Sequence, residues 1–303
     1  MRIDVTPPFD LEATVRLLQR RPRNPLDRFV EGSWLRLLDL PGGPVPIAVE
    51  QRAPGALELR WLAGRPSTSG VRHAVALVRR TLGLDAQLTT FHRADDRFPG
   101  LARLAPVLRG VRPPRFTSLF EAIVGVVPFQ QVSLDAGMAV FARVIEAHGA
   151  RLPVDGPAGI DGLYTAPRPD ALADVSEAEL AAHGMSRAKA RSLQRTAAAI
   201  ATGELSASTL EDLPTPQARA QLVELPGIGP WSADLILLRG FGRLDAFPPR
   251  DVGVARGLGA LLGATPPEEL ARAFAPQQGM LYYTSLIAQL VDRGILRPGS
   301  AVP

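Results

Sequence analysis

The stretch Leu225-Pro-Gly-Ile-Gly-Pro-Trp-Ser-Ala-Asp234 decides the fold, because it separates two segments that have helical patterning. Gly227 and Gly229, with one residue between them, favour a tight turn, and Pro230 suits the first turn of a helix, where no N–H is needed. Amide groups at a helix N-terminus bind anions, so such a hairpin can hold a DNA phosphate without reading sequence. Glycine-rich corners between packed helices are also common, and these ten residues alone leave both interpretations open.

The chain on either side of the hairpin carries further motifs. Downstream, Asp251 stands in Phe247-Pro-Pro-Arg-Asp-Val252, twenty residues after Trp231, which allows one helix and a loop to return the aspartate to the hairpin. Upstream lie Val127-Pro-Phe-Gln-Gln-Val-Ser133 and a helical pattern over Met185–Leu193. An aspartate at this position is also a good helix N-cap, and Asp251 can have both roles.

These motifs, over about 115 to 260, resemble the helix-hairpin-helix DNA glycosylase superfamily, and within it bacterial 3-methyladenine DNA glycosylase II. The resemblance implies a mainly α fold, in which two helical subdomains follow an N-terminal α+β domain resembling half of a TATA-binding protein. We expect the α+β domain to span residues 1–90 and the helical subdomain with the hairpin to span 115–243. Residues 91–114 and 244–303 would form the helical subdomain that carries Asp251.

Hydrophobic periodicity predicts a change near residue 90 from mixed helices and strands to helices alone. Before it, the pattern favours helices over Phe9–Arg20 and Val71–Leu82 and three strands with Gly- and Pro-rich turns, namely Trp34–Leu40, Val45–Arg52 and Leu57–Leu62. After about Phe98 only helices are predicted. They are Leu119–Val126, Val132–His148, Glu177–His183, Arg187–Ala201, Gln217–Glu224, Trp231–Phe241, Val252–Leu262, Pro267–Ala275 and Gly279–Arg293.

Composition limits the other classes of function. The 303-residue chain has no apolar run of about 18 residues, so we expect no membrane span and a cytoplasmic, nucleoid-associated protein. It contains no cysteine, which excludes disulfides, thiolate metal sites and iron–sulfur clusters. The sequence pI is near 10.2, and every basic side chain except Lys189 is arginine. Arginine suits a polyanionic partner, although a GC-rich genome would also favour it.

The resemblance implies a single catalytic carboxylate, Asp251. Most glycoside hydrolases need two carboxylates, but a purine alkylated at N3 or N7 already carries positive charge and leaves without a general acid. The aspartate then has to stabilise the cation that develops on the deoxyribose. A cationic base favours aromatic walls, and the candidates for the base pocket are Trp231, Phe129, Tyr282 and Tyr283, of which the two tyrosines can equally be core residues.

The same resemblance assigns the contacts with DNA. The base must leave the stack before it can be cut, and Gln131, beside Gln130, would fill the vacated space. The expected DNA-binding residues are Gly227, Gly229, Trp231, Gln130 and Gln131. In this family the hairpin also holds a monovalent cation through carbonyl groups, which here would be those of Val223, Leu225 and Ile228. No other cofactor is expected.

Trp231 also decides the type of chemistry that the resemblance implies. Branches of the family that cut the strand have lysine at this position, where its amine attacks C1′. Lys189 belongs to a stripe with Arg187 and Arg191 that is typical of a solvated or phosphate-facing helix surface. We therefore expect a monomer that binds double-stranded DNA containing damaged bases, and that hydrolyses the glycosidic bond to leave an abasic site.

Two alternatives remain at this stage. A DNA-binding protein without catalysis could use the hairpin only to hold phosphates, and it would not need Asp251. A glycosylase of the same superfamily directed at uracil or 8-oxoguanine would keep the motifs. Two departures leave the substrate range open: the last long helix, around Met280–Ile287, lacks the tryptophan common in better-known members, and Leu235 stands where tyrosine is often found.

Overall fold

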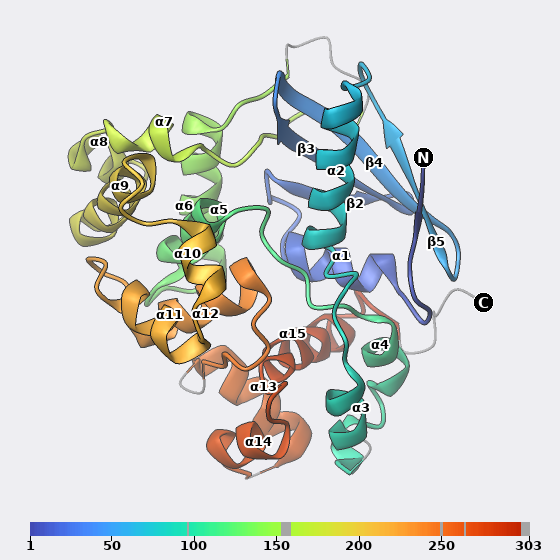
Figure 1. The fold of residues 1–303 in the computed structure, drawn as a ribbon. Coiled ribbons are helices and arrows are strands. Elements are labelled where there is room, and N and C mark those ends of the chain that lie inside the picture. Colours follow the sequence, from blue (N-terminus) through green and yellow to red (C-terminus); the bar gives the residue numbers. More distant parts are fainter. Residues whose placement is uncertain (96, 153–158, 249–250, 264, 298–303) are drawn as a thin grey trace.

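The computed structural model describes residues 1–95, 97–152, 159–248, 251–263 and 265–297, in which a sheet domain precedes a series of helices (Figure 1). The sheet is antiparallel and has five strands in the order β1-β5-β4-β3-β2. The strands are β1 (Arg2–Asp4), β2 (Asp27–Val30), β3 (Ser33–Leu40), β4 (Gly43–Ala53) and β5 (Ala56–Trp61).

Two helices, α1 (Leu11–Gln19) and α2 (Thr68–Thr81), cover one face of this sheet (Figure 1). Side chains alternate between the two faces of a strand, and β3 shows both faces buried. Trp34 contributes to the core beneath the helices, whereas Leu35 packs on the opposite face against Leu163. The sheet is therefore covered on both sides.

Helix α1 joins the sheet domain to the helical body. Its residues Val15 and Leu18 face the sheet, while Ala13 and Leu17 belong to the large core of the helical body. Helix α1 packs against α15 (Met280–Asp292). Because of this packing, the C-terminal end of α1 lies against the helices that carry the functional motifs.

The rest of the described chain is helical, with one core running through it. Its α-helices are α3 (Thr89–Asp95), α4 (Ala105–Gly110), α5 (Leu119–Val124), α6 (Leu134–His148), α7 (Pro169–Ala173), α8 (Glu177–Ala182), α9 (Arg187–Ala201), α10 (Ala207–Asp212), α11 (Thr215–Val223), α12 (Pro230–Ile236), α13 (Val252–Leu262), α14 (Pro267–Ala273) and α15. Short turns of other helix types are η1 (Pro99–Leu101), η2 (Val127–Phe129) and the π-helical η3 (Leu237–Phe241). None of these described helices is long and apolar enough to cross a membrane.

The mainly helical fold with an α+β first domain agrees with the expectation from the sequence. The predicted strands and helices are present with shifted ends, but β1, β2 and the short helices α3, α4, α7 and α10 were not predicted. The strands β1 and β2 form the two edges of the sheet, and each has no more than four residues. Such short segments give too few residues to show a period of two. The division of the helical body into two subdomains stays a prediction, and residues 298–303 of the second one lie outside the described residues.

A buried ionic group fastens the sheet domain to the helical body. Arg36 of β3 binds Asp27 Oδ1 of β2 through Nη1 at 2.7 Å, and Glu121 Oε1 of α5 through Nη2 at 2.6 Å. All three side chains are buried. Burial alone would lower the pKa of Arg36, but the two carboxylates raise it above its ordinary value. The guanidinium therefore stays charged and connects the two parts of the molecule.

Candidate active site

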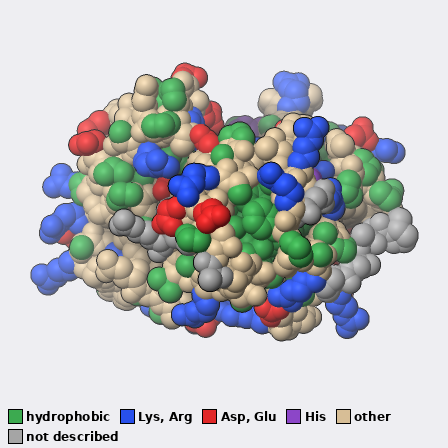
Figure 2. Space-filling model, turned by 90° about the horizontal axis from the view of Figure 1, so that it is seen from below, with side chains coloured by type: hydrophobic (Ala, Val, Ile, Leu, Met, Phe, Trp, Pro, Cys, Tyr) green, Lys and Arg blue, Asp and Glu red, His purple; other side chains and the backbone are tan. Residues whose placement is uncertain are grey.

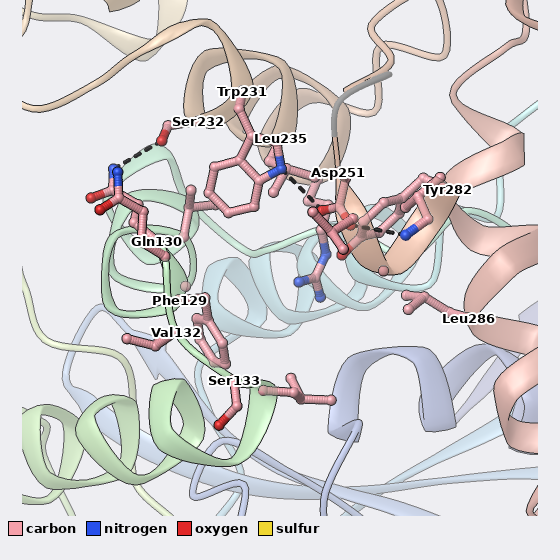
Figure 3. A pocket seen from close by; sticks show the side chains of 18 of the residues that line it. Phe129, Gln130, Val132, Ser133, Trp231, Ser232, Leu235, Asp251, Tyr282 and Leu286 are labelled. Atoms are coloured by element: carbon pink, nitrogen blue, oxygen red, sulfur yellow. Dashed lines mark hydrogen bonds between the residues drawn. The ribbon is translucent and has the colours of Figure 1, made fainter. Parts of the chain in front are cut away.

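A cavity of about 810 Å³ lies where the hairpin, the start of α6, the start of α13 and helix α15 meet (Figure 3). Residues from segments far apart in the sequence line it. They include Asp251, Trp231, Phe129, Tyr282, Gly227, Gly229, Gln130 and Gln131. The structure thus brings together the residues that the sequence predicted for catalysis, DNA binding and the base pocket, with the exception of Tyr283.

Asp251 lies at the N-terminus of α13, where both of its carboxylate oxygens accept hydrogen bonds. Oδ1 accepts the backbone N–H of Val254 at 2.9 Å, which makes Asp251 the N-cap of α13. Oδ2 accepts Nε1–H of Trp231 at 3.0 Å (Figure 3). These two bonds hold the carboxylate toward the cavity. Pro249 and Arg250, which precede it in the quoted motif, lie outside the described residues.

The hairpin between α11 and α12 is a tight turn closed by a hydrogen bond from Ile228 N–H to the carbonyl of Leu225 at 3.1 Å. Gly227 has φ +78°, which glycine adopts without strain. A Cβ at Gly227 would also lie 2.9 Å from Ser192 Cβ on α9. Gly229, with nothing within 4 Å of such a Cβ, is the N-cap of α12. Among the described residues, neither glycine N–H has an acceptor, and both glycines are exposed.

The carbonyls expected to hold a monovalent cation lie at this same turn. The Leu225 carbonyl already accepts one hydrogen bond, which leaves it a second lone pair. Val223 is the last residue of α11, where carbonyls lack partners within the helix. Oxygen donors of this kind are compatible with a hard cation, and the cation stays a prediction.

The segment Val127–Ser133 approaches the hairpin from the other side of the cavity. Gln130 Nε2 donates to the carbonyl of Gly227 and to Ser232 Oγ, both at 2.9 Å. Gln131 is exposed and has φ +54°, an uncommon value for a residue with a side chain. Helix α6 begins at Leu134, after Ser133 caps it, rather than at Val132. Gln130 therefore ties this segment to the hairpin, and Gln131 is the residue that protrudes.

Three of the four predicted aromatic residues line the cavity, namely Trp231, Phe129 and Tyr282. The prediction was wrong for Tyr283, whose side chain is fully buried and whose hydroxyl donates to the carbonyl of Pro114 at 2.9 Å. Burial raises the pKa of this phenol above its usual range. Neighbouring residues on a helix point about 100° apart, so Tyr282 and Tyr283 cannot face one cavity together.

Two arginines that no sequence pattern indicated, Arg20 and Arg239, also line the cavity. Arg20 is the C-cap of α1 in the sheet domain, a part of the chain without any recognised motif. Arg239 lies in η3, with its guanidinium 4.3 Å from the ring centre of Phe116. Only the packing of α1 against the helical body brings Arg20 to the site.

Two other candidate groups lie elsewhere. Lys189 Nζ donates to the carbonyl of Pro128 at 3.2 Å and does not line the cavity. Lys189 is partly exposed, whereas Arg187 and Arg191 are exposed, and the solvated or phosphate-facing role of this stripe stays a prediction. Asp234, the other carboxylate near the hairpin, is buried, and Arg219 Nε donates to it at 2.7 Å. Burial raises the pKa of Asp234, and the bond with Arg219 opposes this shift.

The surface carries basic side chains on several sides. On the face seen in Figure 2, Lys and Arg side chains lie at the outline and also nearer to the centre, interspersed with hydrophobic and acidic side chains. The positive charge implied by the sequence pI is therefore spread over this face, not concentrated in one patch.

Two family models match the chain. The model described as HhH-GPD superfamily base excision DNA repair protein matches residues 124–276. A model of the AlkA N-terminal domain matches residues 1–118. The first match covers the hairpin, Asp251 and the segment with Gln131, and the second covers the sheet domain and reaches α4.

Individual relatives and solved structures are similar to this chain. A probable bifunctional transcriptional activator/DNA repair enzyme AlkA of Mycobacterium tuberculosis is 30% identical over 84% of this chain and 49% of its own length. DNA-3-methyladenine glycosylase 2 of Escherichia coli is 34% identical over 50% of this chain and 51% of its own. The chain thus spans about half the length of these curated relatives. The structure of a 3-methyladenine DNA-glycosylase from Archaeoglobus fulgidus shares the fold, with a TM-score of 0.79 and 22% identity over 96% of this chain and 99% of that chain.

Proposed function

The chain belongs to the HhH-GPD superfamily of base excision DNA repair proteins, and we propose that it is a monofunctional DNA glycosylase that removes alkylated purines from double-stranded DNA. One observation carries the proposal. Asp251 stands in the cavity beside the hairpin, with both carboxylate oxygens held by donors from Val254 and Trp231. A carboxylate held in this way is preorganised to stabilise a transition state in which positive charge develops.

The reaction begins when the damaged nucleotide leaves the helix and enters the cavity. The exposed amides of Gly227 and Gly229 hold the phosphate backbone, and Gln131 fills the space that the base leaves. Gln130 joins these two contacts through its hydrogen bonds to the hairpin. Because the contacts with the duplex are made from two connected segments, the strand is held on both sides of the flipped nucleotide.

The glycosidic bond then breaks with the carboxylate of Asp251 beneath C1′. The bonding electron pair goes to the alkylated purine, whose positive charge is neutralised as it departs. The positive charge that grows on the deoxyribose is stabilised by Asp251, which also orients the water that adds to C1′. That water loses a proton, and the product is an intact strand with an abasic site. No general acid is needed for a base that is already cationic.

The surroundings of Asp251 support hydrolysis over strand cleavage. Strand cleavage requires an amine that attacks C1′. Trp231 occupies the family position of that amine, and the ammonium group of Lys189 is bound to Pro128 outside the cavity. We also propose that the protein acts as a monomer and that the hairpin carbonyls hold a monovalent cation that fixes the turn.

A base-release assay tests this proposal. The protein is incubated with methylated duplex DNA and with duplexes that contain hypoxanthine, uracil or 8-oxoguanine, and released bases are separated by chromatography. We expect methylated purines to be released without strand cleavage and without a borohydride-trapped adduct. Asp251→Asn should retain DNA binding and lose several orders of magnitude in rate, because the charge acts mainly in the transition state.

Asp245→Asn is the matched control, because Asp245 is an exposed aspartate that does not line the cavity. Its base release should equal that of the unmodified protein. DNA binding with no release of any base would indicate a binding protein. Release of only uracil or 8-oxoguanine would assign the protein to another branch of the superfamily.

A further inference from the structure

Arg20 has an unusual backbone conformation that directs its side chain to the cavity. It has φ +53° and ψ −37°, and Arg21 N–H donates to the carbonyl of Gln19 across it. This is a γ-turn of the rarer hand, which is strained for a residue with a side chain. Only two other non-glycine residues of the described chain have positive φ, and one of them is Gln131, which lines the same cavity. Backbone strain of this kind clusters at functional sites.

The guanidinium of Arg20 has an incomplete set of partners. It stands 5.7 Å from the ring centre of Phe129, and its Nε is buried without a hydrogen-bond partner. Within the described part of the chain, none of its three nitrogens makes a hydrogen bond or an ion pair with protein. Burial lowers its pKa, while Tyr282 and Asp251 favour its charged form and Arg239 disfavours it. The side chain of Arg20 is therefore a hydrogen-bond donor in the cavity that lacks an acceptor among the described residues.

The charge of Arg20 bears on which base suits the cavity. A methylated purine cation gains from aromatic walls but is repelled by Arg20 and Arg239, both of which line the space. The repulsion is offset when the base offers an oxygen that accepts from the guanidinium. An oxo-purine has a carbonyl oxygen at C6, which is an acceptor that arginine binds in DNA recognition, and this oxygen stays available in 7-methylguanine, whose N7 carries the methyl group. An amino-purine carries an N–H donor at C6, so it offers the arginine no acceptor at that position.

We propose that Arg20, from the sheet domain, is a specificity residue that donates hydrogen bonds to the carbonyl oxygen of a flipped oxo-purine. It favours 7-methylguanine over the equally cationic 3-methyladenine, and it supports the release of hypoxanthine. This inference rests on the glycosylase function proposed above, and it assigns to the first domain a part in choosing the base. A site that hydrogen-bonds a substrate discriminates strongly, because a base without the matching group leaves Arg20 unpaired.

The test uses one DNA preparation that holds both kinds of base. Methylated duplex DNA contains 7-methylguanine and 3-methyladenine, which are both cationic and differ at C6. The ratio of their initial release rates is measured for the unmodified protein and for Arg20→Met, which keeps the length of the side chain but not its donors. We expect this ratio to fall about ten- to hundredfold in Arg20→Met, the range for a hydrogen bond from a charged donor. Release of neutral hypoxanthine from a duplex should fall by a similar factor.

Arg21→Met is the matched control, because Arg21 pairs with Asp135 at 2.6 Å and does not line the main cavity. It removes the same charge from the next residue and should leave the ratio unchanged. Arg20→Lys keeps the charge and an N–H donor group but loses the planar guanidinium, and its ratio of release rates should lie between those of the unmodified protein and Arg20→Met. If Arg20→Met does not fold, the ratio for Arg20→Lys decides the question.

The outcomes separate the two proposals. A ratio that stays the same in the Arg20 variants, or that falls equally in Arg21→Met, overturns the role of Arg20 while leaving the glycosylase function intact. If the unmodified protein releases no base, the proposed function itself is wrong. A ratio that rises in Arg20→Met would show that the arginine favours amino-purines and would also overturn the inference.

Discussion

Trp231 connects the hairpin to the catalytic candidate through a single hydrogen bond. Its Nε1–H donates to Asp251 Oδ2 at 3.0 Å, and its ring forms part of the cavity wall. Indole nitrogen is a donor only, so this contact requires an acceptor such as the carboxylate. Trp231 therefore orients the carboxylate of Asp251 and also forms part of the cavity wall.

Trp231→Phe should lower the rate of base release about ten- to hundredfold, because it removes a hydrogen bond to a charged group and keeps an aromatic wall. DNA affinity should change little, because the hairpin glycines remain. Single-turnover release rates and binding isotherms measure the two effects separately. The same substitution at Trp61 in β5, outside the cavity, is the control. An unchanged rate in Trp231→Phe would show that the Val254 bond alone holds the carboxylate.

At the scale of elements, the two glycines of the hairpin occupy their positions for different structural reasons. Gly227 requires glycine because of its φ of +78° and its contact with Ser192 of α9. Gly229 has φ −87° and free space where a Cβ would stand. The turn is thus determined by Gly227, and Gly229 leaves its amide open at the start of α12.

Gly227→Val should weaken binding to all duplex sequences by a similar factor, because the contact proposed for the hairpin is with phosphates and not with bases. The strained backbone should cost about 1–3 kcal/mol of stability. Affinities for several unrelated duplexes, measured at one salt concentration, test this expectation. Gly229→Ala is the matched variant and should keep the folding stability. A loss confined to one sequence in Gly227→Val would contradict the phosphate contact.

Helices α6 and α8 meet through two histidines, His148 and His183, whose Nε2 atoms lie 3.1 Å apart. Burial lowers the pKa of both below 6.5, and the neighbouring His183 lowers that of His148 further. Arg143 also lowers the pKa of His183, whereas Glu179 opposes the shift of both. Only one ring can donate in this contact while both are neutral, so protonation of both removes it.

The free energy of unfolding should therefore fall as pH decreases below about 6.5. In that range the unfolded chain binds protons that the folded histidines do not yet accept, so folding loses stability until pH passes the folded pKa values. Above about 6.5 this contribution is fully present. Urea unfolding between pH 7.5 and 5 measures the slope, and the double variant His148→Asn/His183→Asn should reduce it. An equal slope in this variant would assign the acid sensitivity to other groups.

At the scale of the whole molecule, the sheet domain is part of the site and not an appendage. The group of Arg36, Asp27 and Glu121 joins β3 and β2 to α5 inside the protein. The packing of α1 on α15 then brings Arg20 to the cavity. Any change in how the two parts dock would move a cavity residue while leaving the hairpin and Asp251 in place.

Glu121→Gln should destabilise the protein by about 3–5 kcal/mol, because it removes one partner of a buried arginine. Urea unfolding measures the loss. Glu12→Gln provides the control, since Glu12 pairs with Arg16 on the partly exposed side of α1 and should cost no more than about 1 kcal/mol. Equal stability of Glu121→Gln and the unmodified protein would show that the ionic group does not hold the domains together.

Local patterns predicted the long elements well and the short ones poorly. Helices such as α9 and α15 have enough turns to show an apolar face. The edge strands β1 and β2 have three and four residues and form only because β5 and β3 offer partners. Hydrophobic patterning therefore predicts the three interior strands of the sheet and misses both of its edge strands.

The hairpin, the aspartate and the family were determined by the sequence itself, because turn chemistry and spacing are local properties. Gly227, Pro230 and the interval to Asp251 can be recognised without knowing how the helices pack. Which residues face the cavity was decided only by the tertiary structure. In the tertiary structure the side chain of Tyr283 lies in the core, and Trp231 donates a hydrogen bond to Asp251. Arg20 of the first domain lines the cavity. These contacts join residues far apart in the chain, and they depend on the angles at which α1, α12, α13 and α15 pack, which no single segment encodes.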